Sequence, residues 1–257
     1  MDKYALLGYP LSHSFSPLIH NTMFKQKNIN ATYELLPITE DKLHDAIESL
    51  KNGTYKGFNV TIPYKVKIME YLDIVSPRAK EIGSVNTVYY KDGKVIGDNT
   101  DYYGFIEQLR YDNVDPRGMS AYILGTGGAS LAVNKALIDL GAKVTYVSRT
   151  KKDDVLTYDE LYKLDDIDMI VNTTPVGMYP NVSVSPLDED CAKKAKVLVD
   201  IIFNPLTTKL MTFNQNSYNG LAMLVFQAAK AQDIWLGESY KIDEKEVLDK
   251  IRGELHE

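Results

Sequence analysis

Hydrophobic positions in the second half of the chain follow two alternating patterns. Short apolar runs, typical of buried strands, occupy residues 122–124, 144–148, 169–172 and 197–203. Between the runs, apolar residues at three- and four-residue spacing predict helices over residues 131–140, 158–164 and 207–216. Strands that alternate with helices in this way predict a doubly wound parallel sheet.

The first half has a related pattern. Apolar runs predict strands at residues 3–9, 32–37 and 57–62, and amphipathic segments predict helices at residues 18–26 and 40–50. Ser16 followed by Pro17 is typical of an N-cap and a first helical position. Because Asp92-Gly93 favours a tight turn, the runs around it predict a hairpin of residues 85–90 and 95–97, before a helix over 102–109.

A polar segment, residues 112–120, separates the halves, and two helices are predicted after the last strand, at 220–235 and 243–252. Helices at the end of a chain often pack back on an earlier domain. We therefore predict an α/β fold of two domains, an N-terminal α/β domain and a C-terminal Rossmann-type doubly wound domain. The expected boundaries are residues 1–101, completed by helices within 221–257, and residues 102–220.

The composition narrows the class of protein. The 257 residues are 44% hydrophobic and 25% charged, as in ordinary globular proteins. A net charge of −6 argues against a nucleic-acid partner, and no apolar stretch approaches the ~20 residues of a membrane span. The single cysteine, Cys191, excludes an internal disulfide, and the four histidines, His13, His20, His44 and His256, lack metal-ligand spacing. We expect a cytoplasmic protein without a metal, a membrane or nucleic acid as partner.

A glycine-rich turn follows the strand at residues 122–124. It reads Gly125-Thr126-Gly127-Gly128-Ala129 and opens onto a predicted helix. Gly125 would permit the tight turn, Gly127 would let the backbone approach a pyrophosphate, and the helix N-terminus would supply free N–H groups. Ser130 stands where this pattern usually has Gly or Ala, and an ordinary strand–helix loop is the alternative.

The next strand ends in Ser148-Arg149-Thr150, about twenty residues on, where an NAD enzyme places an acid on the ribose 2′-hydroxyl. There is no acid at this strand end. An arginine and two hydroxyls suit a 2′-phosphate, because guanidinium pairs with phosphate through two parallel hydrogen bonds. We expect an NADP site.

The segment Asn59–Lys65 carries three polar groups of one orientation. Asn59 and Thr61 share a strand face because the side-chain period is two. If a helix starts after Thr61, with Pro63 in its first turn, Lys65 falls on the same side at i, i+4 spacing. These groups would point to one spot beyond a strand's carboxyl end, where α/β sheets bind ligands. A solvated surface lysine is the alternative.

Other polar residues have both a binding and a structural interpretation. Ser14 and Ser16 could bind a carboxylate or hydroxyls, or serve turn and cap functions. Asp101 could present a carboxylate or be an N-cap, and Asn86 could be an inward amide or a turn residue. Gln227 lies in an apolar helix and needs a partner, either backbone or ligand.

One further loop, Asn172–Met178, which includes Thr173, ends a strand in a position to cover a nicotinamide. A plain strand–helix loop is the alternative interpretation.

These motifs together identify a family. The segments Ser14–Pro17, Asn59–Lys65, Ser84–Thr87, Gly97–Asp101, Gly125–Ser130, Ser148–Thr150, Asn172–Met178, Asp200–Pro205 and Gly220–Gln227 occur in the order found in shikimate dehydrogenases. The chain resembles this family over essentially its whole length. The resemblance implies an N-terminal α/β substrate domain, a C-terminal Rossmann-type NADP domain, and reversible reduction of 3-dehydroshikimate to shikimate by NADPH.

The resemblance also implies roles for residues. Lys65 would be the acid/base residue and Asp101 its partner, while the substrate would be held by Ser14, Ser16, Thr61, Asn86 and Gln227. NADP would be held by Gly125, Thr126, Gly127, Gly128, Ala129, Ser148, Arg149, Thr150 and Thr173, with Ile201 and Gly220 near the nicotinamide. The protein would be a monomer or a homodimer.

Two residues depart from the family pattern. Ser148 replaces an asparagine at the 2′-phosphate, and Phe203 replaces a tyrosine commonly placed against the substrate. The alternatives are a quinate/shikimate dehydrogenase that also uses NAD, and a non-catalytic module that senses NADP or dehydroshikimate. The presence of both Lys65 and Asp101 disfavours the sensing module.

Overall fold

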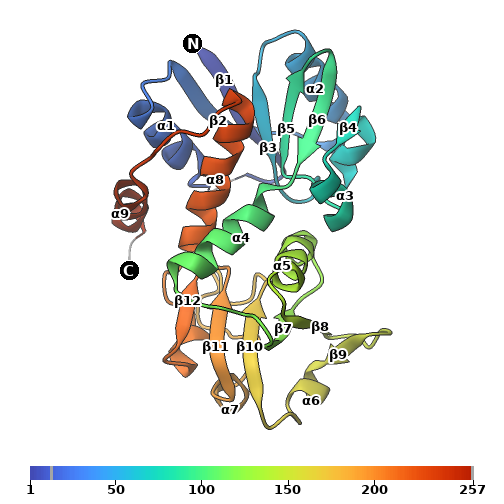
Figure 1. Ribbon diagram of the computed structural model, residues 1–257, viewed down its shortest axis with the longest axis vertical. Helices are drawn as coiled ribbons and strands as arrows, with labels where there is room; N and C mark the ends of the chain where they lie inside the picture. The colour runs from blue at the N-terminus through green and yellow to red at the C-terminus, as the bar shows by residue number, and fades with distance from the viewer. Residues whose placement is uncertain (12–13, 256–257) are drawn as a thin grey trace. The chain divides into compact units, whose positions relative to one another are not determined.

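The computed structural model describes residues 1–11 and 14–255, and the chain divides into two compact units (Figure 1). Unit 1 comprises residues 1–104 and 225–251, and unit 2 comprises residues 105–224 together with the residues from 252 onward. The divisions follow residues 104 and 224, where the sequence predicted boundaries after 101 and 220.

Unit 1 contains a mixed sheet in the order β2-β1-β3-β5-β6-β4. The strands β1 (Asp2–Gly8), β2 (Ala31–Pro37) and β3 (Gly57–Val60) are parallel. The hairpin strands β5 (Thr87–Lys91) and β6 (Lys94–Asp98) are antiparallel, and β4 (Ile74–Val75) pairs with β6. The helices of this sheet are α1 (Ser16–Gln26), α2 (Leu43–Lys51) and α3 (Pro77–Ile82).

The predicted hairpin is confirmed, and its turn explains the sequence signal. Asp92 and Gly93 both have positive φ, +52° and +76°, as a tight two-residue hairpin turn requires. The apolar face of α2, formed by Leu43, Ile47 and Leu50, is buried against the sheet residue Phe58, because burying such a stripe removes its apolar surface from water.

The strand order of unit 1 brings the candidate residues to one edge. Because β1 lies between β2 and β3, the chain turns in opposite directions after β1 and after β2, which makes the β1/β3 edge a topological switch point. The segment with Ser14 follows β1, and the segment with Lys65 follows β3. The antiparallel strand β5 begins at this same edge, so Asn86 lies there too.

Unit 2 contains a fully parallel sheet in the order β12-β11-β10-β7-β8-β9 (Figure 1). The strands are β7 (Ser120–Leu124), β8 (Lys143–Ser148), β9 (Val155–Thr157), β10 (Ile167–Asn172), β11 (Ala195–Asp200) and β12 (Ser217–Asn219). This is the doubly wound order, with its switch point between β7 and β10. The helices within it are α5 (Gly128–Asp139), α6 (Tyr158–Leu161) and α7 (Glu189–Ala192). The predicted Rossmann-type architecture is confirmed.

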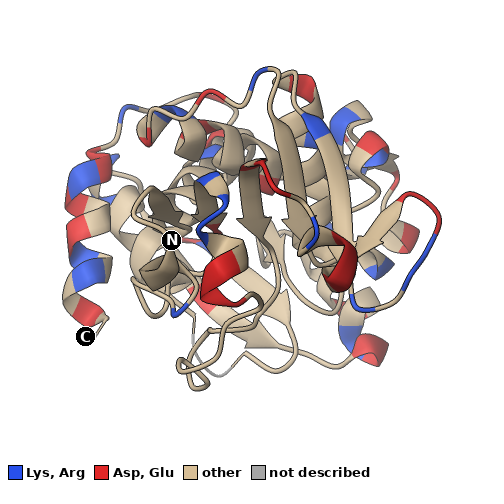
Figure 2. Ribbon diagram, turned by 90° about the horizontal axis from the view of Figure 1, so that it is seen from below, with Lys and Arg blue, Asp and Glu red and all other residues tan. Residues whose placement is uncertain are grey.

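Three further α-helices lie within the described residues. They are α4 (Thr100–Tyr111), α8 (Leu221–Leu236) and α9 (Glu244–Glu254). Acidic and basic residues are interspersed along α9 (Figure 2), where Lys250 pairs with Glu246 at 2.6 Å. None of the helices described in residues 1–11 and 14–255 combines the length and the apolar character that a membrane span needs.

Three local predictions were wrong. Residues 207–216 form only a short 3-10 helix, Met211–Phe213, because polar side chains there bond distant groups; Asn214 Nδ2, for example, donates to the Ala192 and Ala195 carbonyls. No helix starts after Thr61, where turns precede a 3-10 helix at Lys67–Tyr71. Ser16 is not the N-cap of α1 but its first residue.

Candidate active site

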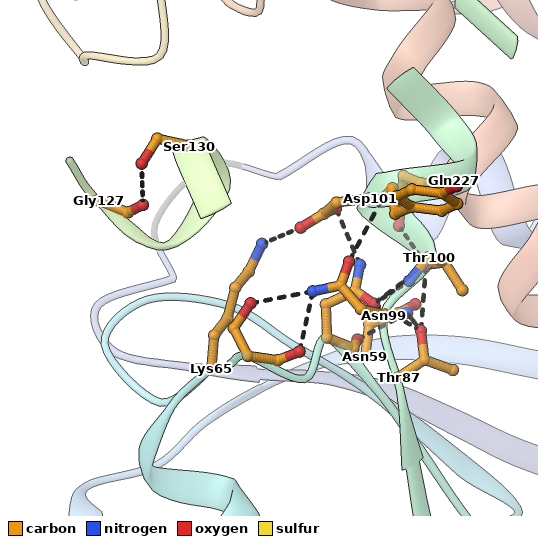
Figure 3. Close-up of polar contacts among 12 residues, drawn as sticks. Asn59, Lys65, Thr87, Asn99, Thr100, Asp101, Gly127, Ser130 and Gln227 are labelled. Carbon is orange, nitrogen blue, oxygen red and sulfur yellow. Dashed lines mark hydrogen bonds and ion pairs between the residues drawn. The ribbon is translucent and has the colours of Figure 1, made fainter. Parts of the chain in front are cut away.

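Lys65 and Asp101 form a short ion pair in unit 1 (Figure 3). The Lys65 Nζ lies 2.6 Å from the Asp101 Oδ2, and the two side chains are only 15% and 10% exposed. We call these two groups the ion pair of the site. Its partial burial weakens solvent screening, so the ammonium and the carboxylate hold each other more firmly than an exposed pair would. Lys65 is therefore not a solvated surface lysine.

Asp101 lies within the first turn of α4 rather than at its cap. The Asn99 Oδ1 accepts from the Tyr102 N–H at 3.3 Å, so Asn99 performs the capping function and leaves the Asp101 carboxylate available for Lys65. The Asn86 Nδ2 donates to the Asp101 Oδ1 at 2.9 Å. Asn86 is 3% exposed, so the inward amide interpretation is the correct one.

Lys65 reaches this position through turns. The Tyr64 N–H donates to the Thr61 carbonyl at 2.9 Å, and the Lys65 carbonyl accepts from the Val85 N–H at 2.8 Å. The second bond ties the segment to the residues that precede β5. The Lys65 ammonium thus reaches the Asp101 carboxylate without the predicted helix.

The two serines are bonded to each other. The Ser14 Oγ donates to the Ser16 Oγ at 3.1 Å and accepts from the Ser16 N–H at 3.2 Å. Gln227, on α8, accepts from the Thr100 Oγ1 at 3.4 Å, next to Asp101 in the chain. The structure thus places Gln227 beside the residues around the ion pair. Thr61 is held at the end of β3 by its main-chain N–H, which donates to the Leu7 carbonyl at 2.9 Å.

The glycine turn of unit 2 lies at the switch point of its sheet. Gly125 has φ +98°, and a Cβ there would lie 2.9 Å from the Thr174 side chain and 3.3 Å from the Thr173 hydroxyl. Gly125 is therefore required both by its backbone conformation and by the approach of the loop after β10. A Cβ at Gly127 would meet no atom of the described residues within 4 Å, so open space faces this backbone.

Ser130 fits the turn through a hydrogen bond. It is fully buried, and its Oγ donates to the Gly127 carbonyl at 2.6 Å (Figure 3). This bond satisfies a hydroxyl that would otherwise be buried without a partner. Serine in place of the usual small apolar residue therefore preserves the turn.

The end of β8 presents an unneutralised arginine. Arg149 is exposed and has no carboxylate partner in the part of the chain that the structure describes. The nearby acid Glu160 is bound by Lys151, whose Nζ lies 2.9 and 3.0 Å from its two oxygens. The Ser148 Oγ accepts from the Thr150 N–H at 3.2 Å and so shapes the strand end. The charge pattern suits a phosphate group.

The loops after β10 and β11 each lie against the end of a neighbouring strand, β7 and β12 respectively. The Thr173 Oγ1 donates to the Leu124 carbonyl at 2.7 Å, at the end of β7. A Cβ at Gly220 would lie 2.0 Å from the Ile201 carbonyl oxygen, so glycine is the residue that permits this approach. Thr173 contacts the glycine turn, and Ile201 and Gly220 contact each other.

A buried aspartate that the sequence analysis did not single out braces these loops. The Asp200 carboxylate accepts hydrogen bonds from the Asn172 Nδ2 at 3.0 Å, the Ile202 N–H at 3.1 Å and the Thr208 Oγ1 at 2.7 Å. Burial raises the Asp200 pKa to about 6 against the opposing effect of these donors. The available signal was an acid that ends an apolar strand, where an unpaired charge would be costly.

We expect the stability of unit 2 to fall as pH rises from 5 to 8. A carboxyl with a raised folded-state pKa contributes stability below its unfolded pKa and loses it as pH passes the folded value, near 6 for Asp200. The change should be about 1 kcal/mol, measured by urea unfolding followed by hydrogen exchange within unit 2. Asp200→Asn should abolish this slope and the exposed Asp166→Asn should keep it; an equal slope in both would contradict the assignment.

The described residues contain no group of three or more His, Cys, Asp or Glu side chains that could hold a metal ion. The candidate site of unit 1 consists of an ammonium–carboxylate pair with amides and hydroxyls around it. The candidate site of unit 2 consists of a glycine turn and an arginine at the end of the neighbouring strand. Such groups can transfer a proton and can bind a dinucleotide phosphate.

Known proteins match this chain over nearly its full length. A family model described as the shikimate dehydrogenase substrate binding domain matches residues 6–88. The NADP(+) shikimate dehydrogenase of Clostridium beijerinckii is 44% identical over 249 residues, which cover 91% of this chain and 92% of that protein. The one from Caldanaerobacter subterraneus subsp. tengcongensis is 40% identical over 273 residues, covering 98% and 97%.

Solved structures of shikimate dehydrogenases are similar to this chain in both fold and sequence. Shikimate dehydrogenase 1 from Peptoclostridium difficile has a TM-score of 0.91 at 36% identity and covers 100% of both chains. The Thermus thermophilus shikimate 5-dehydrogenase, solved in complex with NADP(H) and shikimate, has a TM-score of 0.89 at 30% identity, covering 98% and 99%.

The fold, with its doubly wound sheet and glycine turn, and the relatives named above place the chain in the class of NADP-dependent α/β oxidoreductases. The matched regions cover 91% to 100% of this chain and so extend over both units. The chain belongs to the NADP-dependent shikimate dehydrogenase family.

Proposed function

We propose that the protein catalyses the reversible reduction of 3-dehydroshikimate to shikimate by NADPH, with Lys65 as the acid/base residue. The single observation that carries this assignment is the 2.6 Å contact between the Lys65 ammonium and the Asp101 carboxylate in a largely buried setting. Substrate binding belongs to residues 1–101 with the helices of 221–257, and NADP binding to residues 102–220.

The protein must transfer one proton to or from the substrate oxygen. NADPH, when bound, supplies the hydride that reduces the substrate carbonyl. The Lys65 ammonium donates a proton to the carbonyl oxygen as that oxygen gains negative charge, and in oxidation the neutral amine accepts it. Asp101 directs the ammonium through their 2.6 Å contact.

The substrate carries one carboxylate and several hydroxyls, which need donors and acceptors of fixed position. Residues Ser14, Ser16, Thr61, Asn86 and Gln227 provide them in this proposal. Asn86 is already held by Asp101 and Thr100, so it is preorganised before a ligand binds. The Phe203 side chain lacks a hydroxyl, so it supplies no hydroxyl contact to the substrate in this proposal.

The turn Gly125, Thr126, Gly127, Gly128 and Ala129 holds the pyrophosphate of NADP in this proposal, and Ser148, Arg149 and Thr150 hold the 2′-phosphate. Two observations support the fit: the open space beside the Gly127 backbone, and the absence of a carboxylate on Arg149 within the described residues. Thr173, Ile201 and Gly220 form the loops beside the nicotinamide.

The direct test is to follow the reduction of NADP, and separately of NAD, with shikimate or quinate as substrate. Fast turnover of NADP with shikimate alone supports the proposal. Comparable rates with NAD or quinate would assign the protein to a broader quinate/shikimate specificity. NADP binding without turnover would indicate a sensing module. For the assembly we propose a monomer or homodimer in the cytoplasm, which light scattering after gel filtration and cell fractionation test.

We expect Arg149→Ala to raise the KM for NADP about 10- to 100-fold, because a charge-assisted hydrogen bond is worth roughly 1.5–3 kcal/mol. The KM for NAD should change little, since NAD has no 2′-phosphate. Steady-state kinetics with both cofactors measure the ratio. Lys152→Ala is the control, since Lys152 is an exposed cation three residues away. Equal effects on NADP and NAD would contradict a 2′-phosphate contact.

A further inference from the structure

Buried hydrogen bonds connect Tyr33, on β2, to the residues around the ion pair. The Tyr33 hydroxyl donates to the Asn59 Oδ1 at 2.9 Å. The Asn59 Nδ2 donates to the Asn86 carbonyl at 3.1 Å and to the Thr87 Oγ1 at 3.2 Å (Figure 3). A carbonyl oxygen only accepts, so the orientation of the Asn59 amide is fixed and its oxygen must face Tyr33.

The same logic fixes the next amide. The Thr87 Oγ1 donates to the Asn86 Oδ1 at 3.0 Å, and the Thr100 N–H donates to the same oxygen at 2.7 Å. The Thr100 Oγ1 donates to it as well, at 3.1 Å. Because three donors occupy its oxygen, Asn86 must direct its Nδ2 to the Asp101 Oδ1, 2.9 Å away. The other oxygen of Asp101 is left for Lys65. The orientation of the Asp101 carboxylate is therefore fixed by neutral groups, Asn86 directly and Thr87 and Thr100 through Asn86.

The far end of the connection is also held. His20 is fully buried and stacks on Tyr33, with ring centroids 4.0 Å apart and an interplanar angle of 6°. Burial lowers the His20 pKa to about 3, so the stacked ring is neutral. Tyr33 is thus held on one face by the stacked His20 ring and at its hydroxyl by Asn59.

We propose that Tyr33, Asn59 and Thr87 are positioning residues that orient the Asp101 carboxylate, through Asn86, toward Lys65. The inference rests on the proposed function, in which Lys65 transfers the proton. The groups in the connection are buried, and each of the two amides has one allowed orientation. Removing the Thr87 hydroxyl takes one donor from the Asn86 Oδ1 and one acceptor from the Asn59 Nδ2, so both amides are held less firmly. A rotated Asn86 would turn its oxygen toward the Asp101 carboxylate and repel it.

The first test removes the Thr87 hydroxyl and then restores it. Thr87→Val keeps the shape of the side chain, and we expect it to lower kcat about tenfold, the effect of losing roughly 1.4 kcal/mol in the transition state. Thr87→Ser restores the hydroxyl and should recover most of the activity. A loss in Thr87→Ser with unchanged kcat in Thr87→Val would show that the methyl group's packing, and not the hydrogen bond, matters, and would overturn the proposal.

The second test asks whether the effect passes through Asp101. In an Asp101→Asn background, Thr87→Val should reduce the remaining kcat less than twofold, because the carboxylate that it orients is absent. A full tenfold reduction in that background would overturn the proposal. Tyr33→Phe retains the ring that stacks on His20 and should show the same pattern, and it serves as the independent variant if Thr87→Val fails to fold.

Tyr55→Phe is the matched control. Its hydroxyl bonds to the Glu34 carboxylate in the same unit, so the variant also removes one tyrosine hydroxyl, and kcat should be unchanged. An equal kcat loss in Tyr55→Phe would overturn the assignment, because it would show a general loss of unit 1 structure. A wild-type protein that does not oxidise shikimate would refute the proposed function itself. If the wild type is active but Thr87→Val and Asp101→Asn lower kcat independently, so that their effects multiply in the double variant, only this inference is refuted.

Discussion

Replacing Lys65 with alanine should lower kcat by roughly 10²–10⁴, the contribution typical of general acid–base catalysis. The KM for shikimate should change only a few-fold, because the remaining amides and hydroxyls still bind the substrate. The reason is geometric: in unit 1 the Lys65 ammonium is held on the Asp101 carboxylate at 2.6 Å, so it has a defined position from which to give its proton. Steady-state kinetics in both directions measure kcat and KM separately.

Lys67→Ala supplies the control for this prediction. Lys67 lies two residues further along, is half-exposed, and pairs with Glu40 and Glu70 at 3.4 and 3.0 Å. Removing it takes one cation from the same segment without touching the ion pair of the site, so kcat should stay within twofold of the wild type. If the loss in Lys65→Ala fell on KM alone, Lys65 would be a substrate-binding residue and not the acid.

The architecture could be predicted where local signals agree with the packing. The hairpin was specified by Asp92-Gly93, since few other pairs adopt two positive φ values cheaply. The glycine turn was specified by an apolar strand before Gly125 and a helical pattern after Gly128. In both cases the residues that determine the backbone conformation and the burial pattern lie within about ten positions of each other, so the turn can be predicted without knowing any distant partner.

The two helix predictions, at residues 207–216 and after Thr61, failed because residues distant in the sequence determine the backbone conformation there. Residues 207–216 have a helical pattern, yet Thr208 bonds to the Asp200 carboxylate and Asn214 bonds across to the Ala192 and Ala195 carbonyls. Such bonds compete with the helix hydrogen bonds of the same segment. The turn that places Lys65 is likewise tied to Val85, twenty positions further along the chain. Neither contact is visible in local periodicity.

For the candidate site, the sequence gives residue types but not their orientation. Asp101, Asn86 and Lys65 were found because their motifs are specific, and their binding roles remain proposals. The direction of each hydrogen bond could not be read, because the Asn86 amide is oriented by Thr87 and Thr100, and Asn59 by the Asn86 carbonyl. Asp200 was overlooked as a brace because its three donors come from three separate positions of the chain, Asn172 at the end of β10 and Ile202 and Thr208 after β11.

Gly127→Ala should weaken NADP binding more than tenfold while leaving the fold intact. Gly127 has φ −84° and ψ −177°, an extended conformation that alanine adopts without strain, and its Cβ would meet no atom of the described residues within 4 Å. As an N-cap substitution it should cost less than about 1 kcal/mol of stability. A methyl group at this position would stand between the backbone and the pyrophosphate that we propose approaches it.

Calorimetric titration with NADP, paired with thermal unfolding of the free protein, separates these two effects. Gly253→Ala is the matched control: it adds the same methyl group in α9, also without a contact within 4 Å in the described residues, and it should leave NADP binding unchanged. Equal NADP affinity in Gly127→Ala and the wild type would mean that the open space beside this backbone is not where the pyrophosphate lies. A large drop in Tm together with the loss of binding would instead assign Gly127 to the stability of the turn, because helix N-terminal N–H groups can hold a phosphate only while the turn that presents them persists.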